Sequence, residues 1–242
     1  MTEPWWMIRI ATAPRRPVIA VLTGVAALAL TTGTAQGSPG APDQPSGMRY
    51  GDPAAAAPFW RYQRYDDDCV EMAVADVVGE LTGRQPTEHE IVALAQSTPS
   101  SVHPGPIYTK PRKHHTGAGT SFDDEPTLLG LYGIHAVTTD RDSVAKTRLP
   151  TGMTAMEQDL ALGRKVIAAV NAEIIWGEPV EDEDSNGDPQ ANHAVVLTGV
   201  DTAAGVVHLN DSGSEQGRDE QVPIDVFIRS WDSGDDQMTV TG

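Results

Sequence analysis

The sequence predicts an α+β domain in which helices come first along the chain and an antiparallel sheet follows. Two observations favour this class. Apolar residues recur at helical spacing between residues 69 and 133, and β-branched runs dominate after residue 165. Because the two kinds of segment are largely separated instead of alternating, a sheet built from βαβ units is not expected.

Four segments carry helix signals. Residues 69–83 repeat valines and alanines at helical spacing and end at a glycine, which helices prefer just past their last turn. Residues 87–96 open with a Thr-x-x-Glu capping box, and the same pattern opens residues 154–163. Residues 125–133 carry proline in the first turn and close on glycine, so a short helix is expected there.

The predicted strands lie in the second half of the chain. Residues 165–176 are typical of a buried strand. Residues 193–201 and 206–211 are β-branched runs separated by four residues, of which Gly205 can form the turn, so we expect an antiparallel hairpin. The remaining segments predict a short helix at 223–231 and a closing strand at 237–242.

Residues 1–35 predict a signal peptide. An arginine-containing start precedes the apolar run 18–30, and small residues follow it, with the best cleavage position after Ala35. A membrane-spanning helix needs about 20 apolar residues, so this run is short for one. We therefore expect export, with a mature N-terminus near Gln36 and no membrane association after cleavage. An uncleaved membrane anchor is the alternative.

The mature chain divides into a predicted flexible linker and one domain. Residues 36–58 are rich in Gly, Pro, Ala and Ser without apolar periodicity, and residues 59–242 have a usual size for a single domain. The formal net charge of −17 argues against nucleic acid and anionic lipid as partners, because both need a basic surface. The sequence carries no signal for oligomeric state.

Cys69 is the single cysteine, so it cannot form an internal disulfide. It is a buried small hydrophobe, an intermolecular link or a reactive thiol. Its place in the first turn of a predicted helix favours the last role, because unpaired N–H groups and the helix dipole stabilise a thiolate there. The three aspartates 66–68 directly before it would oppose a thiolate by their charge. We expect them to serve as helix caps.

A thiolate nucleophile also needs a base and a group that orients the base. His193 opens the first strand of the predicted hairpin and Asp211 ends the second, so pairing would bring them to the same end. Gln63, six residues before the cysteine, could donate a hydrogen bond to an oxyanion. Asn210 competes with Asp211 for the orienting role, and because adjacent strand residues face opposite sides, only one of the two can meet His193. His208 lies an odd number of residues from Asp211, so these two side chains should face opposite sides.

These residues together resemble the papain-like bacterial cysteine peptidases related to double-glycine leader peptidases (the peptidase C-thirty-nine-like family). In that family a Gln precedes the nucleophilic Cys by six residues, a His heads a hydrophobic strand and an Asp lies on the next strand. The resemblance covers residues 62–240 and implies Cys69 as nucleophile, His193 as general base and acid, Asp211 as its orienter and Gln63 as oxyanion donor. It also implies a papain-like fold, in which N-terminal helices present the Cys and pack on a C-terminal antiparallel sheet. The chain departs from the family by lacking the Gly that many members carry just after the Cys.

The expected activity is hydrolysis of a peptide or amide bond in a secreted peptide or protein substrate. No organic cofactor is implied, because thiolate acyl chemistry needs none. Two alternatives stay open: an acyl or peptidyl transferase of the same fold, and a non-catalytic secreted binding module.

Two other features lie near the predicted site. Asp182, Asp184 and Asn186 match the first half of a calcium-binding loop, but the twelfth position is a histidine instead of the usual glutamate. They form a weak calcium candidate, with a solvated acidic loop as the alternative. Trp60, Tyr62, Tyr65 and Trp176 could line a peptide cleft, and core packing is the alternative for each.

Overall fold

The computed structural model describes residues 47–111, 117 and 119–242. The predicted signal peptide and residues 36–46 of the predicted linker lie outside the described residues. Within the described part of the chain, no helix combines the length and the apolar character needed to cross a membrane.

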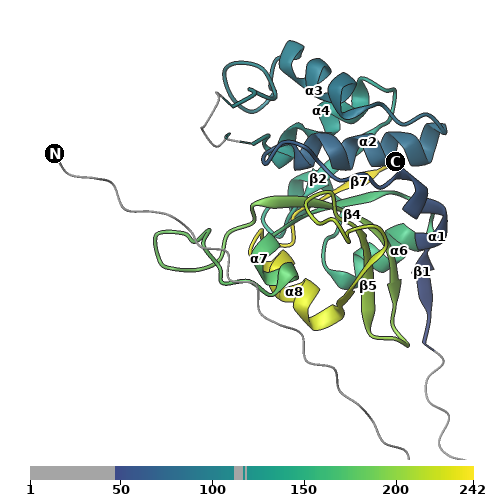
Figure 1. The fold of residues 1–242 in the computed structure, drawn as a ribbon. Helices are drawn as coiled ribbons and strands as arrows, with labels where there is room; N and C mark the ends of the chain where they lie inside the picture. The colour runs from purple at the N-terminus through teal and green to yellow at the C-terminus, as the bar shows by residue number, and fades with distance from the viewer. Residues whose placement is uncertain (1–46, 112–116, 118) are drawn as a thin grey trace, which may run out of the picture. The chain divides into compact units, whose positions relative to one another are not determined.

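The centre of the domain is a seven-stranded antiparallel sheet (Figure 1). Its main order is β2-β7-β3-β4-β5-β6. β3 pairs with the first part of β4, and β1 pairs with the last three residues of β4. The strands are β1 (Arg49–Gly51), β2 (Ala136–Thr139), β3 (Val166–Val170), β4 (His193–Asp201), β5 (Val206–Asn210), β6 (Glu220–Pro223) and β7 (Met238–Thr241).

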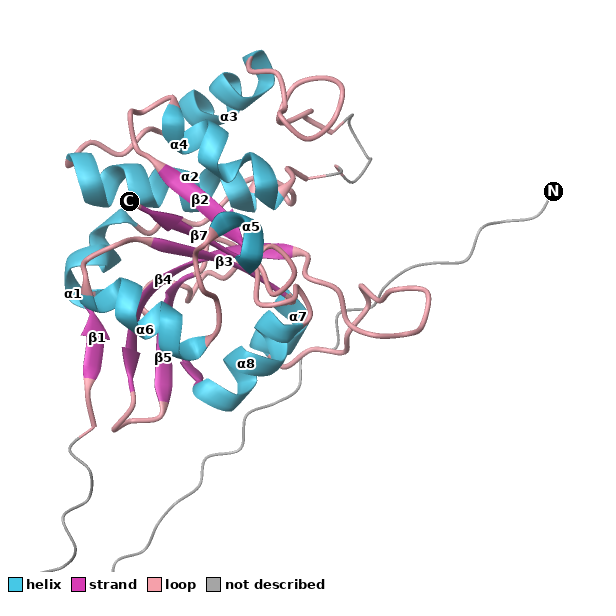
Figure 2. Ribbon diagram, turned by 180° about the vertical axis from the view of Figure 1, so that it is seen from behind, coloured by secondary structure: helices cyan, strands magenta, loops and turns pink. Residues whose placement is uncertain are grey.

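Helices cover both faces of this sheet (Figures 1 and 2). One face carries α2, α3 and α4, and the other carries α6 and α8. The helices are α1 (Pro53–Ala56), α2 (Cys69–Thr82), α3 (Glu88–Ser97), α4 (Glu125–Gly130), α5 (Val144–Thr147), α6 (Met153–Ala161), α7 (Ala172–Trp176) and α8 (Ile224–Asp232), with 3-10 turns at Ala57–Phe59 and Phe122–Asp124.

The alternation of β4 explains why its sequence is apolar almost throughout. Ala194 and Val196 belong to the core cluster that contains α2, whereas Val195 and Leu197 belong to the cluster that contains residues of α6 and α8. Successive strand side chains point to opposite faces, and here both faces are covered. The predicted α+β class, with helices packed on an antiparallel sheet, is confirmed.

The hairpin that carries the predicted histidine and aspartate is also confirmed. Asp201 pairs with Val206 across a turn in which Gly205 adopts a φ of 71°, a value that L side chains rarely take. The pairing continues to Val196 opposite Asn210, past a register shift between Leu197 and Gly199. His193 at the start of β4 and Asp211 just after the end of β5 therefore lie at the same end of the hairpin.

Three local predictions were wrong. The segment 165–176 is not one strand: β3 ends at Val170, and Asn171 caps α7 by accepting the Ile174 N–H at 3.1 Å. The capping box predicted at Thr154 does not form, because α6 begins at Met153 and its N-cap is Gly152, two residues before Thr154.

The third error concerns the linker, whose residues 49–58 are part of the domain. Arg49 pairs with Asp201 in the sheet, and its guanidinium donates to that carboxylate at 2.6 Å. Asp52 caps α1 by accepting the Ala55 N–H at 3.1 Å. Alanine and proline resemble a linker in composition, but they also suit the first turn of a helix.

Candidate active site

Cys69 is the first residue of α2, as the sequence predicts. The residue is 9% exposed, and it belongs to the buried core cluster that contains α2. The residue before it, Asp68, occupies the N-cap position. The first N–H groups of a helix have no acceptor within the helix, so the backbone N–H of Cys69 is available to a ligand.

His193 and Asp211 meet at the end of the hairpin. The imidazole Nε2 and the carboxylate Oδ1 are 2.6 Å apart, and both side chains are buried. Asp211 also accepts the Gly213 N–H on Oδ1 at 2.7 Å and the indole N–H of Trp176 on Oδ2 at 2.8 Å. Burial by itself would raise the pKa of Asp211, but the charge of His193 and these hydrogen bonds hold the pKa below its usual value.

The partner groups of His193 raise its pKa to about 10. Burial acts in the opposite direction, but the charge and hydrogen bond of Asp211 outweigh it, and interaction with the Cys69 side chain raises the pKa further. Because Nε2 is engaged with Asp211, the second ring nitrogen, Nδ1, is left for the thiol. The three residues therefore form one connected group in which the imidazole retains its proton readily.

The neighbouring candidates point elsewhere, as strand alternation predicts. The Asn210 amide donates to the carbonyl of Ala56 at 3.1 Å, on the other side of β5. His208 Nδ1 lies 2.7 Å from an oxygen of Asp219. Neither side chain reaches His193, so Asp211 alone of these residues orients it.

Gln63 is held by hydrogen bonds to Ser212, which lies just beyond β5, and to Tyr65. Its side-chain oxygen accepts the Ser212 hydroxyl at 2.8 Å, and its backbone N–H donates to the Ser212 carbonyl at 2.9 Å. Its amide nitrogen donates to the carbonyl of Tyr65 at 2.8 Å. This nitrogen carries two protons, so one remains for another acceptor.

Sequence reasoning missed two residues that position this group. Ser212 holds Gln63, and Trp176 holds Asp211 while its ring lies against His193, with centroids 5.6 Å apart and planes tilted by 57°. The sequence indicates a cleft wall or core packing for Trp176, and it does not predict the bond to Asp211. The position of Ser212 directly after Asp211 is the one signal that could have indicated its role.

The aspartates before Cys69 do not act as the predicted caps. Asp68 makes no side-chain capping bond, and both of its carboxyl oxygens are buried without a donor among the described residues. Burial, followed by the charges of Glu88 and Glu71, raises the pKa of Asp68 to about 8. Asp67 instead accepts the phenol of Tyr108 at 2.8 Å.

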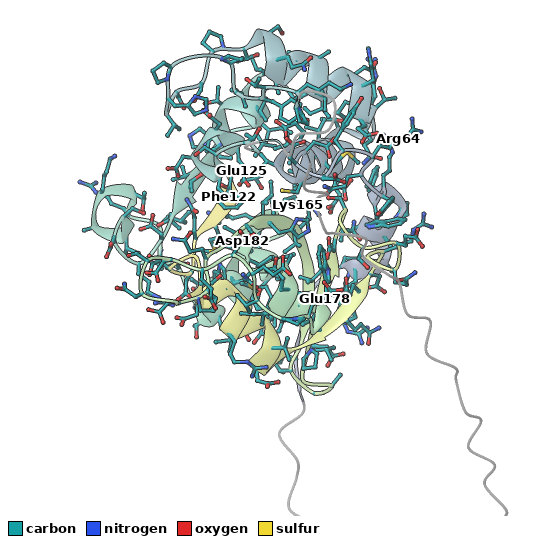
Figure 3. The ribbon with its side chains drawn as sticks, turned by 60° about the vertical axis from the view of Figure 1, so that its left-hand side comes forward. Arg64, Phe122, Glu125, Lys165, Glu178 and Asp182 are labelled. Atoms are coloured by element: carbon teal, nitrogen blue, oxygen red, sulfur yellow. The ribbon has the colours of Figure 1, made fainter. Side chains whose placement is uncertain are left out.

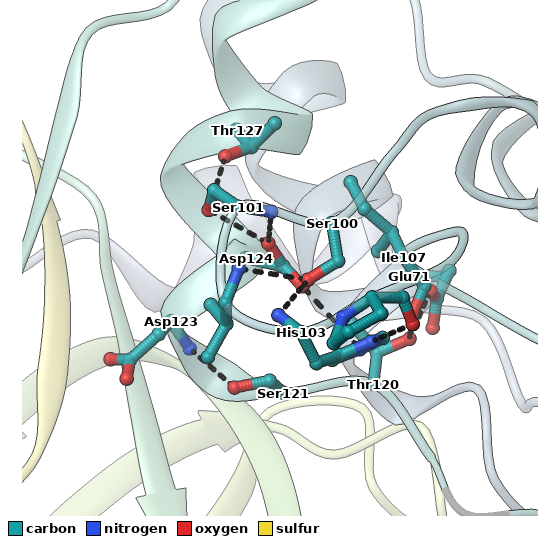
Figure 4. A network of polar contacts seen from close by, with 12 residues as sticks. Glu71, Ser100, Ser101, His103, Ile107, Thr120, Ser121, Asp123, Asp124 and Thr127 are labelled. Atoms are coloured by element: carbon teal, nitrogen blue, oxygen red, sulfur yellow. Dashed lines mark hydrogen bonds and ion pairs between the residues drawn. The ribbon is translucent and has the colours of Figure 1, made fainter.

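A second buried acid lies one turn further along α2 (Figure 4). Glu71 accepts the Thr120 hydroxyl at 2.6 Å, and burial raises its pKa to about 7. Nearby, Asp124 accepts the hydroxyls of Ser100 and Ser101 at 2.6 and 2.9 Å. Because Asp68 and Glu71 hold their protons more strongly than free carboxyls, the negative charge around the thiol is smaller than the count of acids suggests.

A pocket of about 350 Å³ borders His193 and Gln63. Tyr62, Tyr65 and Trp176 line it, as the cleft hypothesis predicts, and Cys69 is not among its lining residues. Trp60 does not line the pocket; its indole donates to the backbone carbonyl of Asp211 at 2.6 Å.

The calcium candidates lie in the loop between α7 and β4, where Figure 3 labels Asp182. Asp182 lines the pocket and accepts the Asn192 amide at 2.7 Å. Asp184 accepts the backbone N–H groups of Asn186 and Asp188 at 2.7 and 3.0 Å, and the Asn186 amide donates back to it. Across the described residues, no three His, Cys, Asp or Glu side chains are arranged to hold a metal ion.

No protein-family model matches this chain. Uncharacterised proteins of Mycobacterium tuberculosis and Mycobacterium bovis are 53% identical over 236 residues, which is 96% of this chain and 98% of theirs. A solved structure described as a C39-like peptidase from Bacillus anthracis aligns with a TM-score of 0.56 at 19% identity, over 81% of this chain and 98% of that chain. A double-glycine motif protease from an AMS/PCAT transporter, solved with its leader peptide, aligns with a TM-score of 0.42 at 15% identity, over 74% and 88%.

Proposed function

The chain belongs to the same family as these mycobacterial proteins and has the fold of a C39-like peptidase, and we propose that it is a cysteine peptidase acting through Cys69, His193 and Asp211. One observation carries the proposal. The buried 2.6 Å contact between His193 and Asp211 leaves the second imidazole nitrogen for Cys69, which itself raises the pKa of His193. A nucleophile beside a base, with an acid that orients the base, meets the requirements of acyl transfer.

In the proposed reaction, the thiol of Cys69 passes its proton to Nδ1 of His193. The thiolate attacks the carbonyl carbon of the scissile bond, and the π electrons move to the oxygen. The free amide proton of Gln63 and the backbone N–H of Cys69 donate to this oxyanion. His193 then gives its proton to the amine nitrogen as the C–N bond breaks, which leaves a thioester.

Hydrolysis of the thioester completes the cycle. His193 takes a proton from water as the water oxygen attacks the thioester carbon, and the thiolate leaves when the carbonyl re-forms. Asp211 stays ionised throughout and holds the imidazole in one orientation. Its low pKa and its three N–H donors support this role.

We also propose that the protein is exported and that its substrate is a peptide or protein outside the cell. The arginine-containing start, the apolar run at 18–30 and the small residues before Gln36 support export. Sequencing the N-terminus of the protein recovered from culture medium tests this. Chain found only in the membrane, beginning at Met1, would contradict it.

The peptidase proposal is tested by the reactivity of Cys69. The folded wild-type protein should react with iodoacetamide at pH 8, and His193→Ala should slow this reaction and abolish cleavage of peptides. Cys69→Ala should fold normally and cleave nothing. A thiol that reacts only after denaturation would make Cys69 a core residue and favour the binding-module alternative.

A second assay separates hydrolysis from transfer. Product analysis with an added amine nucleophile distinguishes release of a free acid from formation of a new amide. Amide as the main product would favour the transferase alternative.

A further inference from the structure

We propose that the pocket beside His193 is a subsite for a cationic substrate side chain, lysine or arginine, recognised by Glu173 and Asp182. The inference rests on the proposed peptidase function and names the substrate class that the site would prefer. Both carboxylates line the same 350 Å³ pocket as His193 and Gln63.

A single neutral amide holds these two carboxylates together. Asn192, the residue before β4, donates its Nδ2 protons to both oxygens of Glu173 at 3.0 Å and to Asp182 at 2.7 Å. Among the described residues, neither carboxylate takes part in an ion pair. Two like charges bridged only by an amide repel each other, and a cation between them would relieve this repulsion.

Gln63 and His193 connect this pocket to the proposed reaction site. Gln63 and His193 are more than nine-tenths buried, yet both reach the pocket wall. The second amide proton of Gln63 has no acceptor within the described chain, since its one bond goes to Tyr65. In the proposed reaction this proton binds the oxyanion of the substrate, so Glu173 and Asp182, which line the same pocket, would lie beside the path of the peptide.

The remaining walls suit the apolar stem of a basic side chain. Trp176 is 38% exposed and Tyr62 is 49% exposed, and both line the pocket. Lysine and arginine can lay their methylene groups along such rings, and their charged ends gain attraction from the ring faces. An acidic side chain would meet both Glu173 and Asp182, so the pocket discriminates by charge.

Matched thiol reagents test the inference without requiring peptidase activity. Cys69 is modified by cationic, anionic and neutral methanethiosulfonates of similar size, and the ratio of the cationic to the anionic rate is measured. The double variant Glu173→Gln/Asp182→Asn should lower this ratio at least about fivefold at low salt, with a smaller drop at high salt.

A control variant separates the pocket from the overall charge of the protein. Glu157→Gln/Asp142→Asn also removes two negative charges, and neither residue lines the pocket. It should change the ratio less than about twofold. Equal ratios in the wild type and the pocket variant, or equal effects of the two double variants, would overturn the inference.

Two further readouts keep this test separate from the proposed function. In NMR titrations, N-acetyl-lysine amide should shift the indole N–H of Trp176 more than N-acetyl-norleucine amide does, and the pocket variant should lose the difference. With a proteome-derived peptide mixture, cleavage sites should be enriched in lysine or arginine. Cleavage without such enrichment contradicts the subsite, whereas a failure to cleave any peptide contradicts the peptidase proposal and leaves the titration to decide on the subsite.

Discussion

Asp211 and Asp68 are both fully buried aspartates beside the candidate site, yet their pKa values shift in opposite directions. Asp211 faces His193 and accepts N–H groups, and its pKa is lowered. Asp68 has no donor among the described residues and lies near Glu71 and Glu88, and its pKa is raised to about 8. Burial is the first cause in both cases, so the donors and neighbouring charges decide the charge state.

This difference answers why three aspartates can precede a nucleophilic cysteine. A protonated Asp68 places no negative charge beside the thiol, while an ionised Asp211 keeps the imidazole protonated and oriented. The same residue type thus serves two purposes, which are set by what surrounds each carboxyl. Of the four predictions that follow, three test this contrast, and the one on Gln63 tests the proposed oxyanion donor.

Removing the charge of Asp211 should have the largest effect. Asp211→Asn keeps the shape of the side chain but loses the charge that holds His193, so turnover should fall about 10³–10⁴-fold. Cys69 should remain reactive towards iodoacetamide. The measurement is kcat on a cleaved peptide, with circular dichroism to check folding; turnover within a factor of ten of the wild type would contradict the role of Asp211.

Removing Gln63, the proposed oxyanion donor, should have the second-largest effect. Gln63→Ala should lower kcat about 10²–10³-fold, because one hydrogen bond to the oxyanion is lost. Alkylation of Cys69 should hardly change, since no carbonyl is attacked in that reaction. Gln63→Glu is the matched variant, and it should be no more active because a carboxylate cannot donate. An equal loss in alkylation and turnover would show that Gln63 only supports the local fold.

Trp176 tests whether the donors of Asp211 set its charge state. Trp176→Phe keeps a ring against His193 but removes the indole N–H, whose bond to a charged group is worth about 1.5–3 kcal/mol. The pKa of Asp211 should rise, so the acid limb of the pH–rate profile should move to higher pH. An unchanged profile with reduced stability would make Trp176 a packing residue alone.

Replacing Asp68 should have the smallest effect. It should stabilise the folded protein, whereas replacing Asp211 should destabilise it. The folded-state pKa of Asp68, about 8, lies above the usual aspartate value of about 4, so the folded protein keeps a proton that the unfolded chain has lost. Stability conferred by this proton is complete below pH 4 and is lost as the pH rises through 8. Asp68→Asn should therefore raise the unfolding free energy at pH 9 by about 1–3 kcal/mol.

Denaturant unfolding at pH 5 and pH 9 measures this effect. The gain from Asp68→Asn should be larger at pH 9 than at pH 5, while Asp211→Asn should destabilise at both. A destabilised Asp68→Asn protein at pH 9 would show that the carboxylate is used in the folded state, and the contrast between the two aspartates would be lost.

Much of the site could be predicted from the sequence because its signals are local. Cys69 follows from helical periodicity, and His193 and Asp211 follow from two β-branched runs around a glycine turn. Strand alternation indicates that only one of Asp211 and Asn210 can meet His193, and the family resemblance favours Asp211, which is the residue in contact with His193. These features depend on spacing along the chain, so the sequence alone determines them.

Other features depend on contacts between distant segments, and only the tertiary structure decided them. Residues 49–51 resemble a linker in composition, and they form a strand only because they pair with β4, some 150 positions later in the chain. The indole of Trp176 donates a hydrogen bond to Asp211, 35 positions away in the chain, and the hydroxyl of Ser212 donates one to Gln63, 149 positions away.

The protonation of Asp68 belongs to the same group. The sequence determines that three acids precede the cysteine, and composition alone would assign them full charge. Burial without a donor reverses this for Asp68, because the cost of a buried charge exceeds that of a buried neutral acid. Local spacing determines the position of each residue within its helix or strand. Packing determines which hydrogen-bond donors and charges surround its side chain, and therefore whether a carboxyl group is ionised.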